Sequence, residues 1–379
     1  MKEGWELHTL GDVATFINGD RSTNYPSKKD YVVDGIPFVN AGNLIQTGLD
    51  IASLNFISQD KYDSLTQGSF VEGDILFCLR GTLGKHSIVQ NGLKGAVASS
   101  LVIIRTKDGF CNKYISYYLD YKQPFIERLN NGAAQPNIPA KTMKGFSIQF
   151  PPNEKQQQSI VEYLDSAFAK IDAMKTNAEK ALNEAKALFQ ASLKEMLEPK
   201  EGWEEKLLPE ISENLDSIRK PVTKGKRTAG IYPYYGASGI VDYVDDYLFD
   251  EDLLCISEDG ANLLMRTYPI AFPISGKVWV NNHAHVLRFK SIVTQKYVEY
   301  CFSGMKLDEY ITGAAQPKLT QKALNSIIIN LPSTLDEQQS IVAALDSLKS
   351  KVDKLQENYD KISQECDALK QAILREVFE

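Results

Sequence analysis

The chain has 379 residues, of which 43% are hydrophobic and 24% are charged, and its formal net charge is −7. This composition excludes a chain that is disordered throughout, and no stretch approaches the length of about 18 apolar residues that a membrane span requires. The negative charge argues weakly against nucleic acid as a partner. Counted by segment, the net charge is +1 over 1–152, −1 over 153–200, −3 over 201–335 and −4 over 336–379, so no segment is strongly basic.

The first segment, residues 1–152, begins with Lys2-Glu3-Gly4-Trp5-Glu6 and shows no apolar core of a secretory signal. Short β-rich runs at 74–78 and 101–104 are separated by turns rich in Gly and Asn. A helical stretch around 113–130 precedes the loop Gly132-Ala133-Ala134-Gln135-Pro136. We predict a mixed α/β domain, with Trp5 as a packing anchor.

The second segment, residues 153–199, reads as one long helix. Residues 154–198 contain no Gly, their first proline is Pro199, and they are rich in strong helix formers. A helix of about 45 residues would be about 67 Å long. A helix of this length needs a partner, because it would otherwise expose its apolar face.

The third segment, residues 200–335, repeats the organisation of the first. It opens on Lys200-Glu201-Gly202-Trp203-Glu204, has a β-rich run at 277–280, and carries Gly313-Ala314-Ala315-Gln316-Pro317 after a helical stretch around 295–310. Between these anchors the first and third segments show no convincing similarity. Neither has long βαβ alternation, which argues against a doubly wound parallel sheet.

The fourth segment, residues 336–379, is a second copy of the long helix. At an offset of 181 residues, 20 of 42 positions are identical between 157–198 and 338–379. The segment contains no Gly or Pro. The chain is therefore an internal repeat, and each unit consists of a divergent globular part followed by a well-preserved helix.

Both helices carry an a/d seam with alternating spacings of three and four. In the second helix the seam holds Leu345, Leu348, Val352, Leu355, Tyr359, Ile362, Cys366, Leu369 and Ile373. The equivalent positions of the first helix hold Leu164, Ala167, Ile171, Met174, Ala178, Ala181, Ala185, Leu188 and Ser192. One seam is bulky and the other is small in its middle, which suits a dedicated pair better than two self-pairing helices.

We predict that the helices pair in one chain as an antiparallel coiled coil with Ala178 near Tyr359 at its centre. The fold class is thus α+β, with two mixed α/β domains joined by two long helices in a pseudo-twofold repeat. Pairing with another subunit and packing within a globular core are the alternatives.

Signatures of catalysis and of metal binding are weak. Pro151-Pro152 lacks the flanking residues of an adenine methyltransferase loop, and neither Lys85 nor Lys277 has P-loop spacing. His283 and His285 share one face of a predicted strand, but no third ligand is in reach by sequence, so we predict no metal. The five cysteines lie far apart and form no C-x-x-C, which suits a reducing cytosol. We therefore expect no catalytic residues and no bound cofactor.

The chain resembles the specificity (S) subunit of type I restriction-modification systems, the HsdS family, over essentially its whole length. The resemblance rests on the two Lys-Glu-Gly-Trp openings, the two Gly-Ala-Ala-Gln-Pro loops, and the helix starts 157–165 and 338–346 with the pattern Gln-Gln-x-Ile-Val-x-x-Leu-Asp. The stretch from Ile256 to Leu287 is also similar to a target-recognition domain of that family.

The resemblance implies a prokaryotic cytoplasmic protein that reads double-stranded DNA. Each globular part would read one half of an asymmetric bipartite site, and the helices would form a spacer that docks two modification (M) subunits. These M subunits would carry S-adenosylmethionine and methylate adenine, and restriction (R) subunits can join them. The S subunit itself would not be catalytic. The alternative from another class is a coiled-coil scaffold whose globular ends bind proteins.

Polar and basic residues are the candidates for DNA contact, because such side chains contact base edges and phosphates. In the first domain they are Arg21, Lys28, Lys29, Asn40, Asn43, Arg80, Thr82, Lys85 and His86. In the second they are Arg219, Lys220, Lys224, Lys226, Arg227, Tyr235, Ser238, Glu258, Asn262 and Arg266. The Gly-rich loop at 79–84 is the most attractive, because backbone can approach DNA there while Arg80 reaches guanine.

The duplicated loops add Gln135 and Asn137 in the first unit, and Gln316 and Lys318 in the second. Their recurrence in otherwise divergent halves indicates a shared role. Positioning the domain on its helix, contacting phosphate, meeting an M subunit and serving as a purely structural turn are the alternatives.

Overall fold

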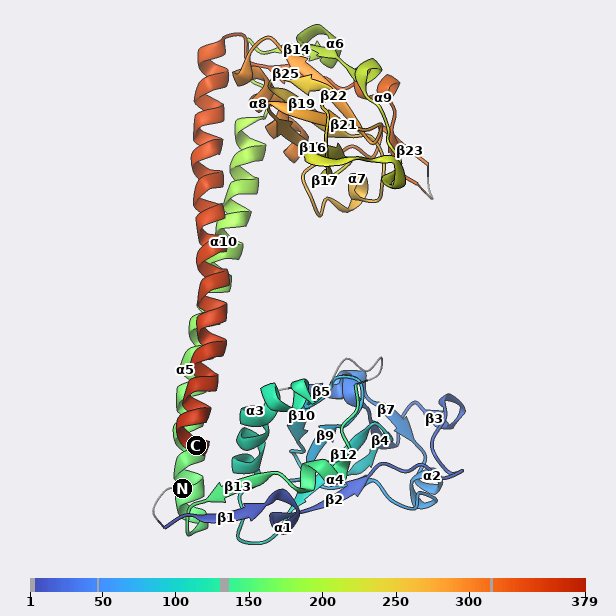
Figure 1. Cartoon of the computed structure of the whole chain (residues 1–379), viewed down its shortest axis with the longest axis vertical. Coiled ribbons are helices and arrows are strands. Elements are labelled where there is room, and N and C mark those ends of the chain that lie inside the picture. Colours follow the sequence, from blue (N-terminus) through green and yellow to red (C-terminus); the bar gives the residue numbers. More distant parts are fainter. Residues whose placement is uncertain (1–3, 46–47, 130–135, 314–315) are drawn as a thin grey trace. The chain divides into compact units, whose positions relative to one another are not determined.

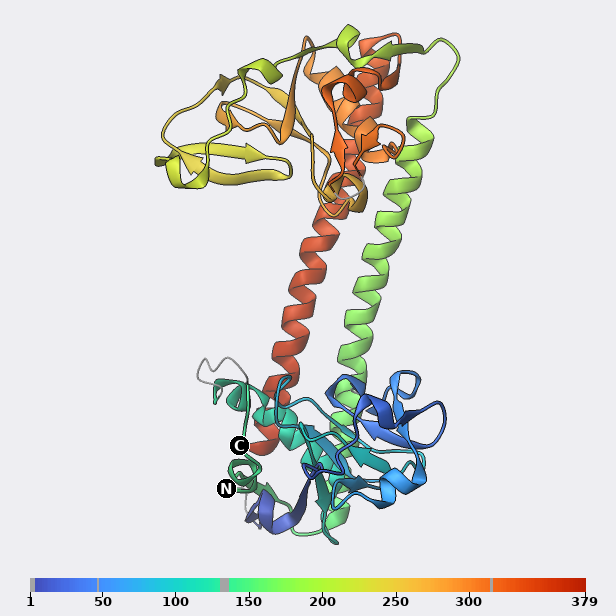
Figure 2. The same ribbon diagram turned by 90° about the vertical axis from the view of Figure 1, so that its right-hand side faces the viewer.

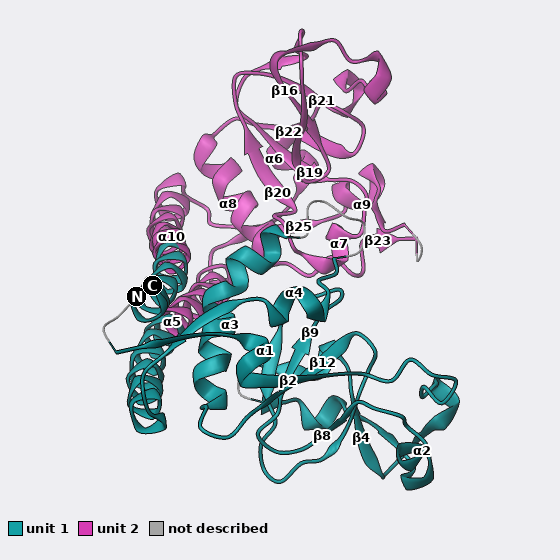
Figure 3. Cartoon of the chain, turned by 60° about the horizontal axis from the view of Figure 1, so that its bottom comes forward, with its two compact units in different colours: residues 1–177, 361–379 teal, residues 178–360 magenta. Residues whose placement is uncertain are grey.

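The computed structural model of the chain describes residues 4–45, 48–129, 136–313 and 316–379 (Figure 1). The chain divides into two compact units, coloured separately in Figure 3: unit 1 comprises residues 1–177 and 361–379, and unit 2 comprises residues 178–360. Each unit therefore contains one globular part and a section of each long helix, α5 (Glu154–Met196) and α10 (Leu335–Phe378).

Unit 1 is built on two sheets. The first is antiparallel, with the order β10-β9-β12-β2. Its strands are β2 (Ala14–Asn18), β9 (Ile75–Cys78), β10 (His86–Ile88) and β12 (Leu101–Thr106). The second has the order β3-β7-β4-β11-β8, in which β4 and β11 run parallel. Its strands are β3 (Tyr31–Val32), β4 (Ile36–Val39), β7 (Asn55–Ile57), β8 (Ser69–Phe70) and β11 (Gly95–Val97).

Smaller elements complete unit 1. Its other strand pairs are β1 (Glu6–Thr9) with β13 (Ser147–Phe150) and β5 (Leu44–Ile45) with β6 (Gly48–Leu49). Its short helices are α1 (Leu10–Val13), α2 (Gln59–Asp63) and α4 (Ala140–Lys144), and its 3-10 turns are η1 (Lys28–Asp30), η2 (Ala41–Asn43) and η3 (Ile51–Ser53). The longer helix α3 (Asn112–Arg128) buries Tyr114, Ile115 and Leu119 in a core that it shares with the antiparallel sheet.

Unit 2 repeats this topology. Its antiparallel sheet has the order β15-β22-β19-β20, with strands β15 (Ser212–Asn214), β19 (Leu253–Ser257), β20 (Ala271–Ile274) and β22 (Ala284–Phe289). Its second sheet has the order β17-β16-β21-β18, with strands β16 (Ala229–Gly236), β17 (Gly239–Val244), β18 (Phe249–Asp250) and β21 (Lys277–Val280). The strands β16 and β21 run parallel, as β4 and β11 do in unit 1.

Several of the remaining elements of unit 2 have counterparts in unit 1. The pair β14 (Glu204–Leu207) and β25 (Ile328–Leu331) matches β1 and β13. The short helices are α6 (Leu208–Ile211), α7 (Asn262–Met265) and α9 (Gln321–Asn325), and the longer helix is α8 (Ile292–Gly304). Unit 2 also contains the 3-10 turns η4 (Asp216–Ile218) and η5 (Lys224–Lys226) and the strand pair β23 (Ile311–Thr312) with β24 (Lys318–Leu319). The globular parts therefore share their main topology although their sequences diverge, and the second sheet has five strands in unit 1 and four in unit 2.

Within each unit the two long helices lie side by side and antiparallel (Figure 2). In unit 1, Cys366 contacts the Ile171 carbonyl at 3.7 Å, and Lys370 pairs with Asp172 at 2.6 Å. Ile171 lies seven residues before Ala178 and Cys366 lies seven residues after Tyr359, so this contact has the predicted register. In unit 2, Lys186 donates to Gln356 at 2.8 Å.

The buried seam of α5 differs in part from the predicted a/d positions. Leu164 and Ile171 are buried, and Ala178 and Ala185 are half-buried. Between them Phe168 and Leu182 are buried, each one residue after the predicted Ala167 and Ala181. Phe168 and Leu182 bury more apolar surface than the alanines beside them, on the same side of the helix. The prediction missed them because it took the seam positions of α5 from those of α10 by a fixed sequence offset.

Three large seam residues lie outside the buried face, because one partner helix covers only a narrow stripe of the surface. Met174 is 58% exposed, Leu188 is 60% exposed and Leu369 is 48% exposed. On α10, Leu345 and Cys366 are buried. The other predicted positions there are half-buried: Leu348, Val352, Leu355, Tyr359, Ile362 and Ile373.

The predicted fold class, two mixed α/β domains with two long antiparallel helices in an internal repeat, is confirmed. Among the described residues, no helix combines the length and the apolar character that crossing a membrane demands.

Candidate nucleic-acid interface

The duplicated helix starts attach each globular part to its long helix. In unit 1 the buried Gln157 accepts a hydrogen bond from the Cys111 backbone at 2.7 Å and donates to the Gly109 carbonyl at 3.2 Å. In unit 2 the equivalent Gln338 accepts from Thr294 at 2.9 Å and donates to the Pro332 carbonyl at 3.0 Å. The repeated glutamine therefore satisfies backbone groups where the globular part meets the helix.

The repeated aspartate makes a second attachment. Asp165 accepts hydrogen bonds from Tyr117 at 2.5 Å and Lys113 at 2.6 Å. In unit 2, Asp346 accepts from Tyr300 at 2.7 Å and Lys296 at 2.9 Å. Burial would raise the pKa of Asp346, but the bonds from Tyr300 and Lys296 outweigh it and lower that pKa.

The tyrosine and lysine partners were missed by the sequence reasoning, although a signal for them exists. Both helices α3 and α8 contain Lys-Tyr-x-x-Tyr, at 113–117 and 296–300. The first tyrosine of each copy also donates to the edge strand, Tyr114 to the Gln149 carbonyl and Tyr297 to the Asn330 carbonyl, both at 2.8 Å.

The segment that follows each Gly-Ala-Ala-Gln-Pro loop is joined by backbone to the loop after the central strand. In unit 1, Gly81 N–H donates to the Pro136 carbonyl at 3.1 Å, and Ile138 N–H donates to the Leu79 carbonyl at 3.0 Å. In unit 2, Gly260 N–H donates to Pro317 at 3.0 Å and Leu319 N–H donates to Glu258 at 2.7 Å. The duplicated segment thus positions a second loop, while Gln135 lies outside the described residues.

In unit 1 this second loop, residues 79–86, presents Arg80 and Thr82 to solvent. Gly81 and Gly84 have φ of +86° and +80°, a region that favours glycine. Gln123 on α3 donates to the Leu83 carbonyl at 3.0 Å and fixes the turn. The loop lines a cavity of about 600 Å³ together with Gln123 and the acidic Asp120 and Glu127.

His86 and Lys85, at the end of this loop, are less accessible than Arg80. The His86 ring is held between the Gly84 carbonyl at 2.8 Å and Ser116 at 3.1 Å. Its side chain is 6% exposed, so it braces β10 against α3. Lys85 is half-buried and Asn137 is exposed.

The other candidates of unit 1 fall into exposed and enclosed groups. Lys28 and Lys29 are exposed in η1, and Arg21 is exposed while donating to the Ser99 carbonyl at 3.3 Å. Asn43 is 3% exposed and donates to Ser53 at 2.9 Å, so it organises η2 from inside. Asn40 is half-buried and accepts from the Gly42 backbone at 2.8 Å.

In unit 2 the basic run 219–227 splits in the same way. Lys220, Lys224 and Lys226 are exposed. Arg227 stacks over the Tyr234 ring at 4.2 Å and pairs with Asp242 at 2.9 Å. Arg219 points into the unit, where it pairs with Glu258 at 2.7 Å.

Four further candidates surround the loop after β19. Ser238 is exposed in the turn between β16 and β17, and Tyr235 stacks on Phe272. The Asn262 side chain bridges the Tyr268 backbone at 2.9 and 3.0 Å. Arg266 donates to the Phe302 carbonyl at 2.8 Å, and burial lowers its pKa. Of these side chains, Ser238 is left facing solvent. In the duplicated segment Gln316 and Lys318 are also exposed.

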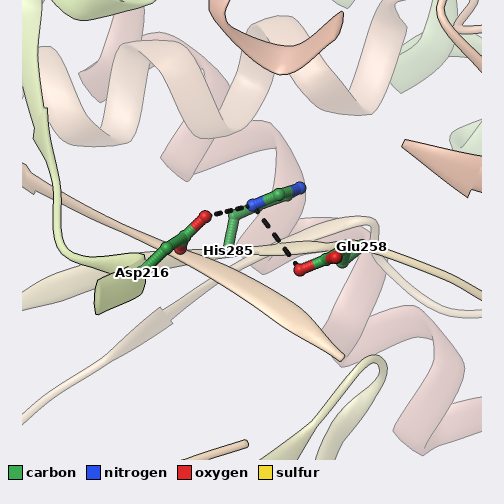
Figure 4. Close-up of side chains that lie close together, drawn as sticks. All are labelled: Asp216, Glu258 and His285. Atoms are coloured by element: carbon green, nitrogen blue, oxygen red, sulfur yellow. Dashed lines mark hydrogen bonds and ion pairs between the residues drawn. The ribbon is translucent and has the colours of Figure 1, made fainter. Parts of the chain in front are cut away.

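A cluster of five charged or titratable groups lies beneath these loops, and Figure 4 shows three of them, Asp216, Glu258 and His285. His285 Nδ1 lies 2.6 Å from Asp216 Oδ2 and 3.8 Å from Glu258 Oε2. Arg219 pairs with Glu258 at 2.7 Å and with Asp216 at 3.2 Å. Lys318 completes the cluster at 3.1 Å from Glu258. We call these five residues the charged cluster.

The charged cluster keeps its carboxylates ionised. Burial would raise the pKa of Asp216, but hydrogen bonds from His285 and the Val286 amide, with the charge of Arg219, lower it. Burial would likewise raise the pKa of Glu258, and the bonds from Arg219 and Lys318 with the charge of His285 lower it.

By distance alone, Asp216, Glu258 and His285 could hold a metal ion. The sequence indicated only the pair His283 and His285 as possible ligands. In the structure, His283 Nδ1 instead lies 2.9 Å from Asp259 Oδ2. Both ring nitrogens of His285 already face protein oxygens, and two cationic side chains occupy the remaining carboxylate positions. The donor set therefore fits an ion-pair network better than a metal site.

Comparison with known proteins identifies the family to which the chain belongs. A family described as "Type I restriction modification DNA specificity domain" matches residues 2–184 and again residues 200–364. The chain belongs to this family. The double match has the same division as the two copies of the topology, so the chain is a type I restriction-modification specificity subunit with two target-recognition domains.

Relatives and a solved structure agree with this assignment. A Haemophilus influenzae protein named as a type I restriction enzyme specificity subunit is 36% identical over 157 residues, which cover 41% of this chain and 40% of that protein. The EcoprrI specificity subunit of Escherichia coli is 22% identical over 91% of this chain and 88% of its own. A chain from a structural study of complex assembly in the type I system is 18% identical with a TM-score of 0.78, covering 100% and 98% of the two chains, and shows the same fold.

Proposed function

We propose that each globular part reads one half of an asymmetric, bipartite DNA site, and that the two long helices dock two M subunits. The observation that carries this proposal is the duplicated frame. The four-stranded antiparallel sheet, the Gln and Asp attachments and the joined loops recur in both units, while the exposed side chains on the loops differ.

Divergence on a constant frame is what two different half-sites require. Direct readout depends on a few side chains aimed at base edges, so changing loop residues changes the sequence read. In unit 1 the exposed candidates are Arg21, Lys28, Lys29, Arg80, Thr82 and Asn137, and in unit 2 they are Lys220, Lys224, Lys226, Ser238, Gln316 and Lys318.

The modest charge of the chain agrees with shared DNA binding. A protein that binds DNA alone needs many phosphate contacts from Lys and Arg. Here several basic side chains are committed to internal ion pairs, Arg219 and Arg227 among them. We infer that the M subunits supply the missing phosphate contacts and carry S-adenosylmethionine, that this chain is not catalytic, and that R subunits can join the complex.

The test is base-resolution methylation mapping in cells that express an M subunit with this chain or without it. We expect a split motif with methylated adenine that requires this chain. If no motif appears while the same M subunit methylates DNA with another specificity subunit, the proposal fails and a protein-binding scaffold becomes the better description. Methyl transfer by the purified chain alone would contradict the non-catalytic role.

A further inference from the structure

We propose that His285 is a positioning residue of unit 2, which in its doubly protonated form holds the segment after the second Gly-Ala-Ala-Gln-Pro loop in the geometry that reads the DNA half-site. This inference rests on the proposed function and adds to it which internal group sets the specificity of one half-site.

The first observation is the position of His285. The residue is fully buried on β22, at the base of three segments that carry DNA-contact candidates. Asp216 lies just before the basic run 219–227, Glu258 opens the loop after β19, and Leu319 follows the exposed Lys318. The imidazole contacts Asp216 and Leu319 directly, and Glu258 lies within ion-pair distance.

The second observation is that both ring nitrogens face acceptors. Nδ1 lies 2.6 Å from the Asp216 carboxylate, and Nε2 lies 2.8 Å from the Leu319 carbonyl. A carbonyl oxygen and an ionised carboxylate accept hydrogen bonds but cannot donate them, so each nitrogen must carry a proton. Neutral histidine has only one N–H, and loss of a proton would therefore break one of these bonds.

The third observation is the contrast with unit 1. In unit 1, strand pairing places Val102 at the position that His285 occupies in unit 2. Leu79 occupies the position of Glu258, because the backbone carbonyl of each accepts a hydrogen bond from the duplicated segment. Both unit 1 residues are buried and apolar. The frame therefore folds without charges at this place, and burying ions costs desolvation free energy. A role in recognition explains why unit 2 keeps them.

The charged neighbours of His285 act in both directions, because the carboxylates of Asp216 and Glu258 attract a positive ring while the cations Arg219 and Lys318 repel it. Asp216 and Glu258 are ionised, Arg219 and Lys318 neutralise them, and the nearby Cys255 thiol is neutral because burial raises its pKa. With His285 protonated the cluster contains two negative and three positive groups.

The first test is the protonation state of the full chain. Nitrogen-15 NMR of the histidine rings, with His285→Gln to assign the signal, is expected to show two N–H groups on His285 at neutral pH. A single N–H would overturn the inference. This measurement involves no DNA, so it decides the matter even if the proposed function fails.

The second test uses the complex of the chain with M subunits and S-adenosylmethionine. Methylation of the cognate site is compared with that of sites carrying one changed base in either half, for the wild-type complex and for the complex with His285→Gln. We expect His285→Gln to lower discrimination in the half-site of unit 2 about tenfold, equivalent to about 1.4 kcal/mol. Discrimination in the other half-site should stay constant.

The matched control is His283→Gln, which removes the neighbouring exposed histidine and should behave as the wild type. Equal losses in both half-sites, or a His285→Gln complex that keeps the discrimination of the wild type, would refute the positioning role. If the wild-type complex methylates no site dependent on this chain, the proposed function fails instead.

Discussion

The end of α10 offers a direct test of how a long helix is attached to a recognition domain. Phe378 is 8% exposed and packs in unit 1 against three tyrosine rings, Tyr114, Tyr118 and Tyr121, with centroid distances of 5.1, 5.6 and 5.7 Å. Replacing a buried Phe by Ala typically costs about 3 to 5 kcal/mol, since it removes apolar burial and leaves a cavity. We expect about 3 kcal/mol for Phe378→Ala, because the last turn of the helix can relax.

Unit 2 contains the matched control for this substitution. The equivalent residue Leu197 is half-buried and lines a cavity of about 420 Å³ beside Cys301 and Gly304, where unit 1 has tyrosines. Leu197→Ala should therefore cost only about 1 kcal/mol.

Hydrogen exchange resolved along the chain, together with urea unfolding, measures both losses. Protection in the last turns of α10 should fall in Phe378→Ala, and α5 near Leu197 should change little in its variant. Equal losses in the two variants, or a loss below about 1 kcal/mol for Phe378→Ala, would refute the packing argument.

Three further predictions follow from the structure. The buried Asp20 accepts hydrogen bonds from Ser22 at 2.6 Å and from Thr66 at 2.7 Å, and although burial would raise its pKa, these bonds lower it. The contribution of Asp20 to the stability of unit 1 is therefore present above about pH 4 and is lost on acidification. Asp20→Asn should make the melting temperature of unit 1 less dependent on pH in the acid range, as measured by thermal unfolding. An unchanged pH dependence would contradict this. Arg80→Ala should relax methylation specificity in one half-site by about 1 to 3 kcal/mol, whereas an equal loss across all sequences would indicate a phosphate contact. Exchanging residues 200–335 for another such domain should alter one half-site in the methylation map, and changes in both halves would exclude modular reading.

The sequence alone was sufficient for the architecture. The 181-residue repeat, the absence of Gly and Pro from the tails and the Gln-Gln-x-Ile-Val-x-x-Leu-Asp starts predicted two units with long antiparallel helices, because helix propensity and heptad spacing are local properties. The register predicted from Ala178 and Tyr359 also agrees with the contact of Ile171 and Cys366.

Only the tertiary structure decided which polar side chains reach solvent. Asn43, His86, Arg219 and Arg266 have the residue types of DNA contacts, but each is committed to partners inside its unit. Composition cannot show this, because burial depends on strands and loops that lie far apart in the chain. Asp216, Glu258 and His285 are separated by up to 69 residues, and only the folding of unit 2 brings their charges together.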